Sequence, residues 1–173
     1  MSMFRHPAAM ALLAAVLLVP PATATAAEAP TVVTADLAGR PIALESVASF
    51  HCHDLDFPRI QCFGTAEARD AALALEADMG SFGPLGATAV SYVIVWENAS
   101  YGGASLVVSQ DYASLTFIGW NDRISSFKAQ NGETGNFYWD WLYGGGVPYT
   151  FCCNQNVSSL GIWNDNISSV RRT

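Results

Sequence analysis

The stretch WENASYGG at residues 96–103 decides the fold, because it recurs as YWDWLYGG at residues 138–145. Both copies consist of an aromatic residue, four further residues, a tyrosine, any residue and a glycine. A second stretch, WNDRISS at residues 120–126, recurs as WNDNISS at residues 163–169. The two motifs return in the same order, 42 and 43 residues further along the chain. This repeated spacing indicates a duplicated unit of about forty residues.

The two copies predict an all-β fold. β-prone runs separated by turn residues occur at 92–96, 105–109, 149–153 and 169–171. Each copy has room for four short strands, and neither can bury an inner face alone. We therefore expect a β-sandwich of two intertwined repeats, at about residues 91–132 and 133–173. Gly103 and Gly145 suit a folded hairpin, since glycine accepts backbone angles that other residues resist, and Tyr101 and Tyr143 are expected to pack across its bend.

Taken together, the two motifs resemble the signature of the microbial βγ-crystallins, a family of calcium-binding Greek-key domains. The resemblance covers roughly residues 92–173, and both motifs are present in both repeats. It implies a two-repeat Greek-key β-sandwich. It also implies a calcium-binding module that is stabilised by two Ca²⁺ sites, with ligands shared between the repeats.

The resemblance assigns a role to eight positions. The second-position acids would each serve the site that the other repeat mainly builds. The third-position residues and one hairpin residue per repeat would give backbone carbonyls, and the fifth-position serines would give hydroxyls. The implied ligands are Glu97, Asp122, Arg123, Ser125, Trp139, Asp165, Asn166 and Ser168. Arg123 places a positive charge beside the first site, whereas the equivalent Asn166 beside the second site is neutral. We therefore expect the two sites to bind Ca²⁺ with unequal affinities, the first more weakly.

The chemistry of these donors independently favours calcium. Carboxylate, carbonyl and hydroxyl oxygens form a hard shell that suits Ca²⁺ better than a soft transition metal. No histidine follows His53, so an imidazole-based zinc site is excluded from the repeats. The alternative is a pair of tight loops in which Asn and Ser side chains cap backbone groups without any metal.

The first residues of the chain indicate export. Arg5 and His6 precede an apolar run at residues 8–19, and Ala24-Thr25-Ala26 offers a small-residue cleavage site. This order predicts a signal peptide at residues 1–26 and a secreted, extracellular product. The run is short for a bilayer span, which makes a retained anchor the weaker alternative. Removal of residues 1–26 would change the formal charge of the chain from −7 to −8. Because an acidic surface repels phosphate groups, nucleic acid is a poor partner for this protein.

Residues 27–90 precede the repeats as a separate segment. We expect irregular chain over residues 27–64, with short strand-like pieces at 31–34 and 41–44. Thr65 suits a helix N-cap, and the alanine- and leucine-rich stretch that follows predicts one helix at residues 66–79. A linker rich in Gly and Pro then leads to residue 90.

Four cysteines, Cys52, Cys62, Cys152 and Cys153, suit disulfides in an exported protein. A bridge between Cys52 and Cys62 is preferred. Cys152 and Cys153 would point to opposite faces if they lay on a strand, so a bond between them would need distorted geometry. The alternative is that each bonds back to the N-terminal segment.

Enzymatic functions find little support in this sequence, and we expect a protein that is not an enzyme. His51 and His53 flank Cys52, but a disulfide at that cysteine leaves no nucleophile. Two other functions stay open. A secreted proteinase inhibitor of similar fold would use a bait loop such as residues 144–148. The other is an extracellular module that binds a cell-wall or surface partner.

Overall fold

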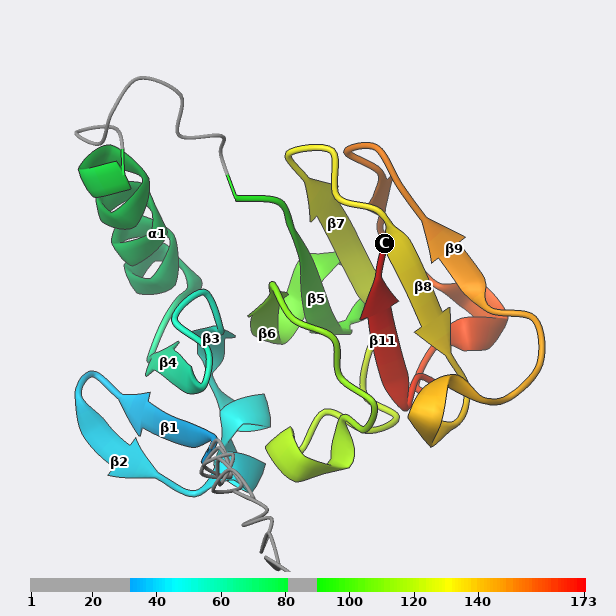
Figure 1. Ribbon diagram of the computed structural model, residues 1–173, viewed down its shortest axis with the longest axis horizontal. Helices are drawn as coiled ribbons and strands as arrows, with labels where there is room; N and C mark the ends of the chain where they lie inside the picture. The colour runs from blue at the N-terminus through cyan, green and yellow to red at the C-terminus, as the bar shows by residue number, and fades with distance from the viewer. Residues whose placement is uncertain (1–31, 81–89) are drawn as a thin grey trace, which may run out of the picture. The chain divides into compact units, whose positions relative to one another are not determined.

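The computed structural model describes residues 32–80 and 90–173 and is mainly β-structure with one α-helix (Figure 1). The strands are β1 (Thr34–Leu37), β2 (Arg40–Ile42), β3 (His51–His53), β4 (Arg59–Phe63), β5 (Tyr92–Asn98), β6 (Gly102–Val108), β7 (Ser126–Gln130), β8 (Gly135–Tyr138), β9 (Tyr149–Phe151), β10 (Asn156–Val157) and β11 (Ser169–Arg172). Within the described residues they form an eight-stranded sheet, β10-β7-β5-β6-β3-β4-β1-β2, and a three-stranded sheet, β11-β8-β9. The predicted all-β class with one helix is confirmed.

The two repeats are intertwined, as the motif spacing predicts. β10 belongs to the second repeat but pairs with β7 of the first, with Val157 opposite Phe127. In return, Tyr112 of the first repeat forms an isolated bridge with Val170 in β11. Between the sheets lies a core in which the rings of Phe127, Phe137 and Phe151 contact one another and are fully buried. Exchange of chain segments explains why neither repeat has a complete core of its own.

Each repeat begins with the folded hairpin that its first motif predicts. Ser100 and Tyr101 have positive φ in the first hairpin, and Leu142 and Tyr143 have it in the second. The two glycines at the ends of the motifs also have positive φ, and an added Cβ at Gly103 would lie 2.6 Å from Asn98 Nδ2. The tyrosine rings pack edge-on against Trp96 and Tyr138, with centroids 5.2 and 5.6 Å apart. The positive φ angles and the close packing therefore explain why the same tyrosine and glycine positions recur in both hairpins.

Helix α1 (Ala66–Gly80) agrees with the prediction to within one residue. The backbone N–H of Ala68 donates to Thr65 Oγ1 at 3.2 Å, so Thr65 is the N-cap. Residues 32–80 and 90–173 contain no helix that is long and apolar enough to cross a membrane. The predicted signal peptide at residues 1–26 and most of the Gly/Pro linker lie outside the described residues.

The segment before the helix is more regular than expected: the strand-like pieces expected at residues 31–34 and 41–44 overlap β1 and β2, whereas β3 and β4 were not expected. Strands β1 to β4 continue the sheet of the first repeat, because β3 pairs in parallel with β6 through His51–Ser105, Cys52–Leu106 and His53–Val107. β1, β2 and β3 have only three or four residues each, too few to show a clear alternation of apolar and polar positions, so their sequence carries little strand signal. Only β4 alternates, with Ile60 and Cys62 buried between more exposed neighbours. Pairing with β6 supplies the backbone partners that these strands need.

A buried acid joins this segment to the repeats. The Asp54 carboxylate accepts hydrogen bonds from the Ser109 N–H at 2.6 Å and from the Tyr112 hydroxyl at 2.9 Å. Burial raises the pKa of Asp54 above its ordinary value, although these hydrogen bonds act in the opposite direction. Since Asp54 follows β3 directly and both donors lie in the first repeat, this contact fixes the position of the added strands.

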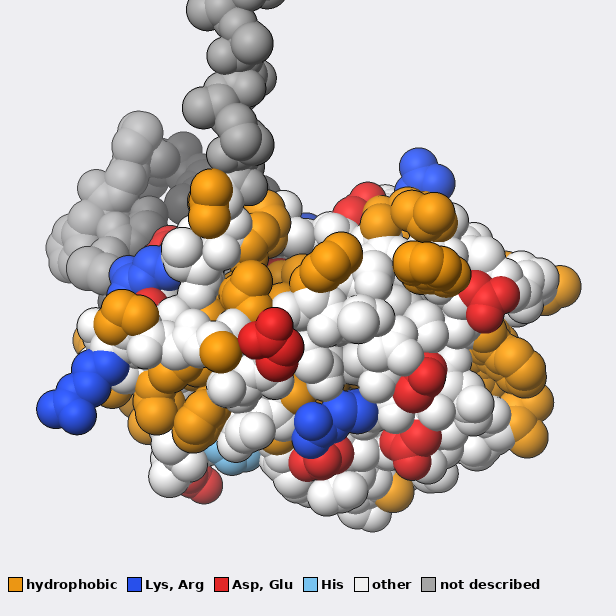
Figure 2. Space-filling model, turned by 90° about the horizontal axis from the view of Figure 1, so that it is seen from below, with side chains coloured by type: hydrophobic (Ala, Val, Ile, Leu, Met, Phe, Trp, Pro, Cys, Tyr) orange, Lys and Arg blue, Asp and Glu red, His pale blue; other side chains and the backbone are white. Residues whose placement is uncertain are grey.

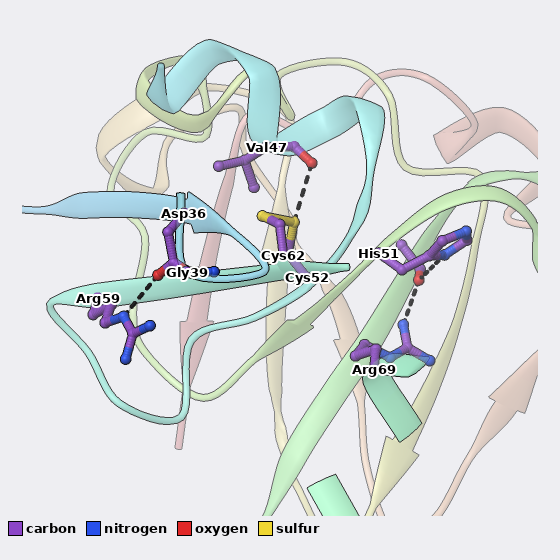
Figure 3. Close-up of a disulfide and its surroundings, with 9 residues drawn as sticks. Asp36, Gly39, Val47, His51, Cys52, Arg59, Cys62 and Arg69 are labelled. Carbon is purple, nitrogen blue, oxygen red and sulfur yellow. Dashed lines mark hydrogen bonds and ion pairs between the residues drawn. A yellow bond between two sulfur atoms is a disulfide. The ribbon is translucent and has the colours of Figure 1, made fainter. Parts of the chain in front are cut away.

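The preferred disulfide, Cys52–Cys62, is present and joins β3 to β4 (Figure 3). In the same region Arg59 donates to Asp36 at 2.7 Å, and this hydrogen bond holds the pKa of Asp36 below its ordinary value. Figure 2 shows acidic and basic side chains interspersed on one face of the molecule, which fits local pairing of this kind.

Candidate calcium sites

The two Asn-Asp-x-x-Ser-Ser loops have matching backbones. Each follows a 3-10 turn, at Thr116–Ile118 in the first repeat and at Gly161–Trp163 in the second. Asp122 and Asp165 both lie in the left-handed region, with φ of 53° and 55°. Asn and Asp enter this region more readily than most residues. The sequence therefore specifies the same unusual loop twice.

The loops meet reciprocally. Ser125 Oγ donates to Asp165 Oδ1 at 2.9 Å, and Ser168 Oγ donates to Asp122 Oδ1 at 3.1 Å. Each serine thus contacts the acid of the other repeat. We call Ser125 with Asp165 the first pair, and Ser168 with Asp122 the second pair.

Backbone hydrogen bonds fix both pairs in place. The N–H of Asp122 donates to the carbonyl of Ile167, and the N–H of Asp165 donates to the carbonyl of Ile124, at 3.0 and 3.1 Å. The serine N–H groups donate to hairpin carbonyls of their own repeats, Ser125 to Trp96 and Ser168 to Tyr138, both at 2.9 Å. The residues whose carbonyls accept these bonds, Trp96 and Tyr138, directly precede Glu97 and Trp139, the implied hairpin ligands. Each pair therefore lies beside the hairpin of the repeat that supplies its serine.

The first motif position orients the acid beside it. Asn121 Nδ2 donates to Asp122 Oδ2 at 2.7 Å, and Asn164 Nδ2 donates to Asp165 Oδ2 at 2.8 Å. Both oxygens of each carboxylate are therefore directed by neighbouring groups, and one of them faces the serine hydroxyl.

The last serine of each motif is a structural residue that the sequence reasoning did not single out. Ser126 Oγ donates to the carbonyl of Asn98 at 2.7 Å and accepts from the N–H of Tyr101 at 3.1 Å. Ser169 makes the equivalent two contacts in the second repeat, with Asp140 and Tyr143, at 2.6 and 3.1 Å. These serines tie each loop to its hairpin, and their recurrence in both copies was the available signal.

The geometry of the pairs fits two neighbouring calcium ligands. Ca²⁺ binds oxygen at 2.3–2.6 Å, often in a pentagonal bipyramid, whose adjacent equatorial oxygens lie about 2.8 Å apart. The hydroxyl and carboxylate oxygens of the pairs are 2.9 and 3.1 Å apart. Among the described residues, no group of three or more His, Cys, Asp and Glu side chains could hold a metal. Each site would therefore depend on one carboxylate, one hydroxyl and backbone carbonyls.

The surroundings of the two pairs differ. Near the first pair, the Arg123 guanidinium lies 2.5 Å from Glu97 Oε1 and donates to the carbonyl of Ala48 at 3.1 Å. Arg123 therefore points toward the N-terminal segment, and its charge is partly neutralised by Glu97. In the second loop, Asn166 Nδ2 instead donates to the carbonyl of Asn164 at 2.7 Å.

The second pair opens onto a surface depression of about 340 Å³, which is lined by Thr116, Asn121, Asp140, Trp141 and Ser168. Trp139 is 42% exposed, and its ring packs edge-on against Trp163 with centroids 5.0 Å apart. The indole of Trp139 therefore packs against another ring. Only the backbone carbonyl of Trp139 would serve as an ion ligand. Trp141, which lines the depression with Ser168, and Trp139, which follows the Tyr138 carbonyl that Ser168 contacts, lie close enough to report on changes at the second pair.

One histidine contact resembles a nucleophile with its base. His51 Nδ1 lies 2.9 Å from Ser105 Oγ, and burial together with Arg69 lowers the pKa of His51. Ser105, however, is fully buried, and Arg69 donates a hydrogen bond to the same hydroxyl. A catalytic serine must reach its substrate, which the buried Ser105 does not. The contacts among His51, Ser105 and Arg69 instead join helix α1 to β3 and β6 (Figure 3).

Comparisons with known proteins agree with the sequence motifs. No protein-family model matches the chain, and no curated protein matches it either. Among solved structures it is similar to a βγ-crystallin from an archaeon, with 32% identity over 49% of this chain and 99% of that chain, at a TM-score of 0.44. A βγ-crystallin from Ciona intestinalis has 25% identity over 47% of this chain and 99% of that one, at 0.44. A βγ-crystallin domain from Clostridium beijerinckii has 26% identity over 47% and 95%, at 0.41.

Proposed function

Because this chain belongs to the βγ-crystallin family, we propose that it is an exported calcium-binding module with two Ca²⁺ sites shared between its repeats. The observation that carries the proposal is the reciprocal contact of Ser125 with Asp165 and of Ser168 with Asp122. Simple capping would satisfy each loop from within its own repeat. Here both hydroxyls and both carboxylates are directed across the repeats, at spacings suited to shared ligands.

The ligands proposed for the first site are the Ser125 hydroxyl, the Asp165 carboxylate and the Glu97 carbonyl. Those proposed for the second are the Ser168 hydroxyl, the Asp122 carboxylate and the Trp139 carbonyl. Backbone carbonyls of Arg123 and Asn166 would complete the two shells. With one carboxylate per site, the expected affinity is that of extracellular calcium modules, about 10⁻⁴ to 10⁻³ M.

Calorimetric titration of the mature protein with Ca²⁺ tests the proposal directly. We expect two ions per chain with unequal affinities and a change in tryptophan fluorescence, since Trp139 and Trp141 lie beside the second pair. A matched titration with Mg²⁺ should give a much weaker response, because Mg²⁺ demands a near-octahedral shell and keeps its waters. Neither heat nor fluorescence change at millimolar Ca²⁺ would overturn the assignment.

The proposal assigns binding and no catalysis to this chain. Its export rests on residues 1–26, which lie outside the described residues. Secretion of a fused reporter by residues 1–26, and its retention when the apolar run at residues 8–19 is interrupted by charge, tests that part separately.

A second candidate function, proteinase inhibition, is favoured by one observation. Val147 is 86% exposed within the loop at residues 144–148, where Gly145 and Gly146 have φ of 91° and 88°. An exposed apolar side chain on a tight loop suits insertion into a proteinase pocket. If this function holds, Val147→Asp should abolish inhibition of a secreted proteinase and Asp122→Ala should not. Absence of inhibition across a panel of metallo- and serine proteinases would leave calcium binding, or a surface ligand, as the function.

A further inference from the structure

Two adjacent thiols remain outside the candidate calcium sites. Cys152 and Cys153 are both exposed and carry no disulfide, while Cys52 and Cys62 are bonded to each other. Opposite-facing side chains are expected only if these residues lie on a strand. In the structure β9 ends at Phe151, and Cys153 and Asn154 have φ of 61° and 63°. The pair therefore lies at the start of a tight turn and not on a strand, so the geometry that would separate the two side chains is absent.

The two thiols interact with each other. A hydrogen bond with the Cys153 side chain, followed by desolvation, raises the pKa of the Cys152 thiol. This contact would be absent if the side chains pointed to opposite faces of a strand. Both sulfurs are therefore within reach of a single small partner at the surface.

The backbone of this turn is held by its surroundings. The Gln155 N–H donates to the Cys152 carbonyl at 2.9 Å, which closes the turn, and the Cys153 N–H donates to the Glu133 carbonyl at 3.0 Å. From the neighbouring turn, the Gly132 N–H donates to Asn154 Oδ1 at 3.0 Å. The main chain is thus fixed while the thiols stay exposed, which lowers the ordering cost of binding through both sulfurs.

The surroundings restrict the kind of ion that fits. No third Cys, His, Asp or Glu joins these thiols in a possible metal cluster among the described residues. The nearby Glu133 carboxylate is held by Arg172 at 2.7 Å and is only 2% exposed. A zinc site needs four ligands, whereas soft thiolates alone suit a soft ion of low coordination number.

From this geometry we propose that Cys152 and Cys153 form an exposed bidentate site for one soft, thiophilic centre, either monovalent copper or a trivalent arsenical. Binding of copper would replace two S–H bonds with two Cu–S bonds and release two protons. Phenylarsine oxide would form two As–S bonds, and its oxygen would leave as water with both thiol protons. Neither reaction needs an oxidant or a reductant.

Phenylarsine oxide and Cu⁺ serve as separate probes of this site. The full chain, with Cys52–Cys62 intact, is titrated with phenylarsine oxide under argon and then exposed to millimolar 2-mercaptoethanol. We expect one arsenical per chain, retained by mass spectrometry. Since the second As–S bond is intramolecular, Cys152→Ser and Cys153→Ser should each weaken retention by about 100-fold or more. Competition for Cu⁺ against bicinchoninate, with the same variants, shows whether copper shares the site.

Two results would overturn the proposal. One is that the unsubstituted chain retains no more arsenical than either serine variant does. The other is isolation of the chain with Cys152 and Cys153 already joined to each other and unreactive toward the probe. Asp122→Ala is the matched control and should bind the arsenical normally. The outcome is therefore independent of whether the calcium proposal holds.

Discussion

Two double variants with equal numbers of changes distinguish shared calcium sites from independent loops. In the shared arrangement, Ser125→Ala with Asp165→Ala removes two ligands of one site, because these side chains are 2.9 Å apart across the repeats. Ser125→Ala with Asp122→Ala removes one ligand from each site, because Asp122 contacts Ser168. Independent loops predict the reverse, since Ser125 and Asp122 lie in the same loop. We expect the first variant to keep one site and the second to lose both.

The expected stabilisation follows from linkage between binding and folding. At a free Ca²⁺ concentration one hundred times the dissociation constant, each site adds about 2.7 kcal/mol to the free energy of unfolding. For a protein of this size, that corresponds to a rise in Tm of about 5–10 °C. The first double variant should show this single-site shift, and the second should show almost none. Without calcium, each lost Ser–Asp hydrogen bond should cost about 0.5–1.5 kcal/mol.

Scanning calorimetry in EGTA and in Ca²⁺ measures these shifts, and each variant is compared with itself so that the different costs in the calcium-free state cancel. Isothermal titration then counts the ions that remain. A single-site shift in the Ser125/Asp122 variant, together with none in the Ser125/Asp165 variant, would refute the shared arrangement.

Three further predictions concern charge and covalent structure. Arg123→Gln should tighten the first site by about fivefold in a calcium titration, because a positive charge beside Glu97 is removed; unchanged affinity would show that the Glu97 carboxylate already neutralises it. The Arg59 hydrogen bond lowers the pKa of Asp36 below 3.8, so the stability it supplies is present above that pH and is lost as the pH falls through the folded-state pKa. Asp36→Asn should therefore flatten the acid side of a urea-unfolding profile, and an identical profile would contradict this account. Cys62→Ser should lower the free energy of unfolding by about 2–3 kcal/mol through loss of the bridge to Cys52, as measured by urea unfolding against a reduced-protein control.

The repeats could be predicted because their local backbone requirements appear twice in the chain. A positive φ at Gly103 and a left-handed Asp122 restrict the residues allowed at those positions, and equivalent residues recur in the second repeat. Helix α1 was also predictable, since Thr65 and the following alanines determine it locally. The resemblance implied that ligands are shared, and the Ser–Asp contacts across the repeats are consistent with it.

Long-range pairing limited the rest of the prediction. Strands β1 to β3 are too short to show periodicity, and they join the sheet because β3 pairs with the edge of β6. The direction of Arg123 likewise depends on Ala48, which lies 75 residues earlier in the sequence.

The sequence by itself determined the duplicated unit, the folded hairpins, the paired Asn-Asp loops and the helix, because each depends on backbone angles and spacings within a few residues. The tertiary structure decided which acid meets which serine, that the N-terminal strands extend the first sheet, and that Arg123 points toward Ala48. These features depend on contacts between distant segments, whose free energy is gained only when the core is assembled.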